Sequence, residues 1–144
     1  MHKNFGAKAM RYPIPVYILG TYNADGTPNA MNAACDYVGI VSGNIETNKF
    51  AKAGFHTTKS EFVDEPLIDE LPMALECELI SYDPETCRLV GRIVNVSADK
   101  SVLGKNSKVD STKLQSIAYD PMSHHYLVLG EKGGQAFHDG LTLK

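Results

Sequence analysis

Residues 15–34 read PVYILGTYNADGTPNAMNAA, and this stretch predicts a β-hairpin. Its first half, Pro15–Tyr22, is rich in β-branched and aromatic residues, which favour strands. Asn23–Gly26 supplies residues that tolerate the positive φ of a tight turn. The returning strand, Thr27–Ala34, carries small and amide side chains where a core strand would carry bulk. Such side chains let a flat ligand or another backbone approach closely and offer it hydrogen bonds.

A second hairpin is predicted further along the chain. Residues 73–82 alternate apolar and acidic side chains with a period of two, so we expect a half-buried strand with Leu75, Cys77 and Leu79 facing inward. A turn sequence then leads into residues 88–98, the strongest strand pattern in the chain. The two strands together form the hairpin.

The remaining pattern adds short helices and a last strand. Helices are predicted over residues 44–54, which end in a glycine, and over 112–117, with Asp110 or Ser111 as the cap. Residues 125–130 predict a final strand. Strands dominate, so the fold class is mainly β with short helices, and the sheets are antiparallel.

Size and composition restrict the possible functions. The 144 residues predict a single domain, and the apolar (43%) and charged (22%) fractions are ordinary for a globular protein. The net charge of −3 argues against a nucleic-acid partner. The sequence has neither a run of eighteen apolar residues nor an apolar signal-peptide core, and its three scattered cysteines fit neither a disulfide framework nor a zinc site. We therefore expect a cytoplasmic protein with reduced thiols and no membrane association.

Nine blocks in order along the chain carry a resemblance to known proteins. They are Tyr12–Val16, Gly20–Gly26, Pro28–Ala34, Asp36–Gly43, Lys49–Gly54, Lys59–Asp64, Leu75–Leu79, Val90–Val96 and Tyr119–Pro121. Together they resemble one family, the FMN-binding split-barrel proteins that include flavoredoxin and the flavin reductase-like proteins. The resemblance covers nearly the whole chain, and the ordered set is more specific than any single block. It implies an antiparallel split β-barrel, noncovalently bound FMN and a homodimer with its cofactor sites near the subunit interface.

The chain departs from this family at one place. The resemblance implies a central stretch on the order of forty residues, enough for two or three strands, between Ala34 and Asp36. Only Cys35 stands there. A shortened relative, an edited sequence and an internal loss from the gene remain open. The split barrel is then either incomplete or completed by dimerisation, because exposed strand edges must be covered or paired.

The resemblance also implies where the cofactor binds. The candidate FMN-binding residues are Asn29, Met31, Asn32, Ala33, Ala34, Tyr37 and Lys49. The Asn32 amide and the backbone of the two alanines would hydrogen-bond the polar edge of the flavin. The alternative for the strand residues is plain packing against another element, and for Tyr37 it is a core aromatic.

A cation near the cofactor phosphate is a further expectation, because phosphate binding uses cations or backbone amides. Lys49 is the first candidate, with Lys8 and Arg11 in the N-terminal arm as others. The alternative for each is a solvated surface side chain. Neither a catalytic side chain nor a metal site is predicted, since a flavin carries its own hydride and electron chemistry.

The resulting hypothesis is an FMN-dependent oxidoreductase, with NAD(P)H or a redox protein as the electron donor. The alternative is a shortened split-barrel relative without turnover, acting as a flavin carrier or as a binding and interaction module.

Overall fold

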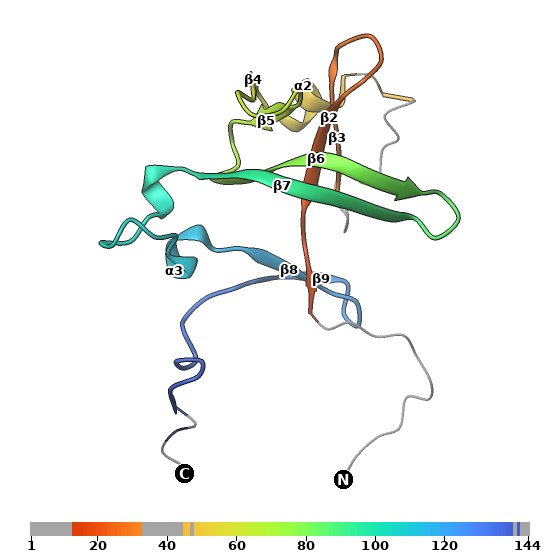
Figure 1. The fold of residues 1–144 in the computed structure, drawn as a ribbon. Coiled ribbons are helices and arrows are strands. Elements are labelled where there is room, and N and C mark those ends of the chain that lie inside the picture. The colour runs from red at the N-terminus through yellow and green to blue at the C-terminus, as the bar shows by residue number, and fades with distance from the viewer. Residues whose placement is uncertain (1–12, 33–44, 47, 140, 142–144) are drawn as a thin grey trace.

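The computed structural model describes residues 13–32, 45–46, 48–139 and 141 (Figure 1). Its strands are antiparallel and its helices are short, so the predicted fold class is confirmed. The elements are β1 (Ile14–Pro15), β2 (Ile18–Tyr22), β3 (Pro28–Asn32), α2 (Lys49–Ala53), β4 (Thr57–Lys59), β5 (Pro66–Ile68), β6 (Met73–Asp83), β7 (Arg88–Ala98), η1 (Lys100–Val102), α3 (Ser111–Leu114), β8 (Ile117–Asp120) and β9 (His125–Val128).

The described strands form four separate sheets and do not close into a barrel. These are β1-β8-β9, β2-β3, β4-β5 and β6-β7. The long β6–β7 ribbon crosses the middle of the molecule, with the β2–β3 hairpin, α2, β4 and β5 above it and β8–β9 below (Figure 1). Within the described residues, the split barrel is thus incomplete.

The first hairpin forms as the sequence predicts. Ile18 pairs with Asn32 and Tyr22 with Pro28 across β2 and β3. Gly26 has φ +81° at the turn, a value that glycine adopts without strain. The Asp25 carboxylate accepts hydrogen bonds from the hydroxyl and backbone N–H of Thr27, and these bonds lower the pKa of Asp25 below its usual range.

The small core lies between this hairpin and α2. Ala30 (1% exposed), Phe50 (7%) and Ile68 (9%) pack together there. The predicted helix is shorter than expected within the described residues, but it ends at Gly54, whose φ of +73° gives the left-handed C-cap. Ile45, which lies within the predicted range 44–54, precedes the helical turn and is 85% exposed.

The β6–β7 ribbon corrects one prediction about burial. Leu75 and Leu79 are 47% and 66% exposed, and Cys77 is exposed as well, whereas Glu76 is 4% exposed. The apolar face predicted to be inward therefore lies on the surface. The reason is that the described elements cover little of this ribbon, so strand alternation has no core to face.

Two register shifts interrupt the ribbon. They lie between Glu76 and Cys77 and between Leu79 and Ser81. Bulges of this kind bend a strand and increase its twist. Cys77 lies opposite Ile93, and Leu75 lies opposite Val96, so these four side chains share one face of the ribbon with Leu79. We call this set, Leu75, Cys77, Leu79, Ile93 and Val96, the apolar ribbon face.

The C-terminal elements complete the three-stranded sheet. Asp110 caps α3 by accepting a hydrogen bond from the N–H of Thr112, as one of the two predicted caps. The last strand is shorter than the predicted 125–130 and pairs with β8. The sequence did not predict β1, in which Ile14 pairs with Tyr119 and so joins the start of the described chain to β8.

Candidate functional site

We call the predicted FMN-binding segment, residues 29–34, the cofactor strip. Strand β3 carries the described part of this strip. Ala30 points into the core, and Met31, on the opposite face, is 54% exposed. The side-chain amide of Asn29 donates to Oδ1 of Asn23 at 3.0 Å, so it also braces the turn of the hairpin. The strip therefore has one face packed and one face open, and the open face is accessible to a planar ligand.

Lys49 lies beside this strip. It is the first residue of α2 and is 3% exposed, and the next residue, Phe50, packs against Ala30 of β3. The alternative of a solvated surface lysine is therefore wrong for Lys49. A buried ammonium group is costly unless neighbouring groups compensate its charge.

The structure joins only part of the predicted site. The predicted residues of β3 and Lys49 lie on two elements that pack together. Asn32 is the last residue of β3 and pairs with Ile18 of β2. Ala33, Ala34 and Tyr37 lie outside the described residues, as do Lys8 and Arg11.

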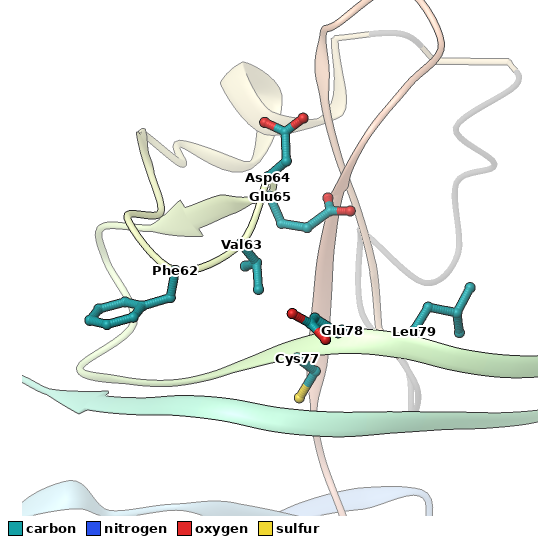
Figure 2. Close-up of a pocket in the computed structure, with 7 residues that line it drawn as sticks. All are labelled: Phe62, Val63, Asp64, Glu65, Cys77, Glu78 and Leu79. Carbon is teal, nitrogen blue, oxygen red and sulfur yellow. The ribbon is translucent and has the colours of Figure 1, made fainter.

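An open cleft of about 350 Å³ lies beside β6, on the side away from β7 (Figure 2). Three carboxylates line it together with Phe62, Val63, Cys77 and Leu79, and these carboxylates belong to Asp64, Glu65 and Glu78. Its described lining includes no basic side chain, so the cleft repels an anionic group.

A buried polar network that sequence reasoning missed borders this cleft. The Ser60 hydroxyl donates to one oxygen of Glu76, and the Asn95 amide donates to the other at 2.6 Å. Ser60 Oγ also accepts hydrogen bonds from the N–H groups of Phe62 and Val63. The network ties the loop after β4 to the ribbon. Strand alternation predicted Glu76 to be solvated, and no local signal marks it as buried.

In the part of the chain that is described, the cysteines and histidines are not grouped as a metal site requires. Cys77 and Cys87 are both free and exposed. His124 Nδ1 lies 2.6 Å from the Tyr119 hydroxyl. Among the described residues, no three His, Cys, Asp or Glu side chains are grouped so that they could hold a metal ion. None of the helices described there has the length and apolar character to cross a membrane.

Comparison with solved structures assigns the fold to a class, that of the FMN-binding, flavin reductase-like split-barrel proteins. The resemblance seen in the sequence is thereby confirmed. The FMN-binding domain of a flavin reductases-like enzyme from Shewanella baltica OS155 matches 84% of this chain and 88% of its own, with 15% identity and a TM-score of 0.67.

Within that class, the chain is similar to flavoredoxins. Flavoredoxin of Desulfovibrio vulgaris (Miyazaki F) matches 97% of this chain and 100% of its own, with 28% identity and a TM-score of 0.86. Flavoredoxin from Methanosarcina acetivorans matches 100% and 98%, with 19% identity and a TM-score of 0.77. No family model matches the chain, and no curated protein sequence does either.

Proposed function

We propose that the chain is a flavoredoxin-like oxidoreductase domain that binds FMN noncovalently and transfers electrons or hydride through it. The observation that carries this proposal is the likeness to flavoredoxin of Desulfovibrio vulgaris over 97% of the chain, at a TM-score of 0.86. The donor would be NAD(P)H or a redox protein, and the location would be cytoplasmic. The two exposed, free cysteines fit a reducing compartment.

The described residues fit an anionic flavin in two respects. The open face of β3 presents the Asn29 amide and the exposed Met31 to a planar ring, and Lys49 supplies a cation on α2, the helix that packs against Ala30 on the other face of the strand. When bound, FMN would supply the hydride and electron chemistry. In this proposal Asn29, Met31 and Asn32 support the ring together with Ala33, Ala34 and Tyr37. Asn32 and the alanine backbone hydrogen-bond its polar edge, and Lys49 holds the phosphate.

The first test is the visible absorbance spectrum of the purified protein, before and after FMN is added and the excess removed. The proposal expects oxidised-flavin bands that remain with the protein. Protein that high-micromolar FMN cannot saturate would overturn it and would favour a binding or interaction module. Retained flavin without NAD(P)H oxidation would favour a flavin carrier, or an oxidoreductase with a protein donor.

A second test examines the role of Lys49 in phosphate binding. Lys49→Met keeps most of the side-chain volume and removes the charge. Hydrogen bonds to charged groups contribute about 1.5–3 kcal/mol, so we expect FMN affinity to fall by roughly 10- to 100-fold. Riboflavin lacks the phosphate, so its affinity should change little. The matched control is Lys52→Met in the same helix, where the lysine is paired with Glu46. Equal losses for FMN and riboflavin would contradict a phosphate contact.

We also propose that the protein is a homodimer. The apolar ribbon face exposes large side chains, among them Leu79 (66%), Ile93 (55%) and Val96 (51%). Contiguous exposed apolar surface of this kind usually marks an interaction site. Sedimentation velocity over a range of concentrations tests this proposal, and a monomer at all concentrations would contradict it.

A further inference from the structure

Polar side chains at the turn end of the β2–β3 hairpin are joined in series by hydrogen bonds. The Thr27 hydroxyl oxygen lies 2.6 Å from Oδ1 of Asp25. Nδ2 of Asn23 lies 2.9 Å from the same hydroxyl oxygen, and Nδ2 of Asn29 lies 3.0 Å from Oδ1 of Asn23. We call Asp25, Thr27, Asn23 and Asn29 the hairpin network. It begins in the turn and ends on the open face of β3, within the cofactor strip.

The carboxylate at one end fixes the direction of every hydrogen bond in this network. The bond from the Thr27 hydroxyl is the main cause of the lowered pKa of Asp25, so the carboxylate is ionised at neutral pH and can only accept. The hydroxyl has one hydrogen, which it gives to Asp25, and its oxygen therefore accepts from the N–H2 of Asn23. The Asn23 oxygen is then turned toward Asn29, which has to offer its own N–H2.

The network thereby decides which way the Asn29 amide is turned. If this amide turned over, its oxygen would meet the Asn23 oxygen, and two acceptors would face each other with no hydrogen between them. The Asn29 N–H2 therefore points toward the turn, and Oδ1 points away from it. Among the described residues no group donates to this Oδ1, and no unpartnered side-chain oxygen is buried, so Oδ1 is accessible to a ligand.

We propose that Asn29 Oδ1 accepts a hydrogen bond from the N3–H of bound flavin. The other three members of the hairpin network are positioning residues that hold the amide in this orientation. The oxidised isoalloxazine ring has one N–H group, at N3, and its remaining polar edge atoms accept hydrogen bonds, so an acceptor on the open face of β3 selects N3. Met31 on the same face is 54% exposed and gives the ring an apolar surface. The assignment rests on the proposed function and specifies one contact of that site.

The affinities of the protein for FMN and for 3-methyl-FMN test the contact. The analogue has a methyl group in place of the N3 hydrogen and keeps the phosphate. We expect FMN to bind about tenfold more tightly, because the analogue leaves Oδ1 of Asn29 without a donor. Asn29→Leu keeps the size of the side chain and removes the amide, so the ratio of the two affinities should fall to about one. Flavin fluorescence titrations measure both affinities, and circular dichroism checks that each variant folds.

Two matched threonine variants test the positioning residues. Thr27→Val removes the hydroxyl from the hairpin network but keeps the backbone N–H that also donates to Asp25, so the turn retains that bond. The Asn29 amide is then free to turn over, and the affinity ratio should fall to about threefold or less. The control is Thr86→Val, which removes the same kind of bond, from a threonine hydroxyl to Asp83, in the distant β6–β7 turn. This variant should leave the ratio unchanged.

NMR of the flavin-free protein reports the amide orientation separately. The Asn29 side-chain N–H that donates to Asn23 should exchange with water more slowly in the unmodified chain than in Thr27→Val. Equal exchange, or a ratio that Asn29→Leu abolishes and Thr27→Val leaves intact, would overturn the positioning role. Equal affinities of the unmodified chain for FMN and 3-methyl-FMN would overturn the N3 contact and leave flavin binding standing. Protein that binds neither flavin would overturn the proposed function as well.

Discussion

Ser60 donates its hydroxyl hydrogen to Glu76, and the two residues are 6% and 4% exposed. This contact joins the loop after β4 to the central ribbon, and Asn95 completes it from β7. A buried carboxylate held by neutral donors is unusual, because buried charges are costly unless paired and hydrogen-bonded. The contact therefore fixes where the ribbon lies relative to the first half of the chain.

Removing the Glu76 carboxylate should destabilise the fold. Glu76→Ala leaves the buried Ser60 hydroxyl and Asn95 amide without their acceptor, and we expect a loss of about 2–3 kcal/mol in the free energy of unfolding. Glu78→Ala is the control on the same strand, since it removes only the surface ion pair with Arg92, worth about 1 kcal/mol or less. Urea unfolding of both variants measures the difference. Equal losses would show that the Glu76 network contributes no more than a surface pair.

The His56–Glu70 pair predicts a pH dependence of stability. His56 Nδ1 lies 2.6 Å from Glu70 Oε1, and the backbone N–H of His56 also donates to that carboxylate. The side-chain hydrogen bond, with the charge of Glu70, raises the pKa of His56 above 6.5. The same hydrogen bond, with the backbone one, lowers the pKa of Glu70 below 4.5.

The sign of the effect follows from these directions. The His56 contribution is complete below pH 6.5 and is lost as pH rises through the raised pKa of the folded protein. The Glu70 contribution is complete above pH 4.5 and is lost as pH falls through its lowered pKa. The stability difference between the unmodified chain and His56→Gln should be largest between these pH values. Urea midpoints measured from pH 3 to 9 test this, and a difference that does not vary with pH would rule the pair out as its source.

Replacing Gly26 with a residue that has a side chain should destabilise the fold. Its φ is +81°, and beyond its chain neighbours no atom lies within 4 Å of the position that a Cβ would take, so the effect of Gly26→Ala is backbone strain rather than a clash. We expect a loss of about 1 kcal/mol, the usual penalty for a non-glycine residue in this conformation. Gly130→Ala is the matched control, since Gly130 also has open space around it but no positive φ. Thermal unfolding of the two variants makes the comparison.

The sequence predicted local structure well wherever neighbouring residues decide it. The Asn23–Gly26 turn, the Gly54 stop and the Asp110 cap all depend on side chains within a few positions of one another. The pairing of β1 with β8 was not predicted, because Ile14 and Tyr119 are distant in sequence and no short-range pattern links them.

Burial was harder to predict because it depends on what packs against each face. The alternation in β6 is real, yet Leu75 and Leu79 are exposed and Glu76 is buried. Lys49 was predicted as a cofactor contact from the family resemblance, and only the structure reveals that it is buried. A periodic pattern indicates that a strand has two different faces but does not identify what covers each face.

The apolar ribbon face leads to a prediction about assembly. Val96 is 51% exposed, so Val96→Lys should leave the stability of a single copy nearly unchanged. In a dimer that covers this face, the substitution would bury an unpaired ammonium group, and the dimer dissociation constant should rise at least tenfold, which corresponds to about 1.4 kcal/mol. Val128→Lys is the matched control, a 62% exposed valine on β9, away from the ribbon. Sedimentation equilibrium of both variants measures the constant. If Val128→Lys weakens the dimer and Val96→Lys does not, the interface lies on the β8–β9 sheet and not on the ribbon.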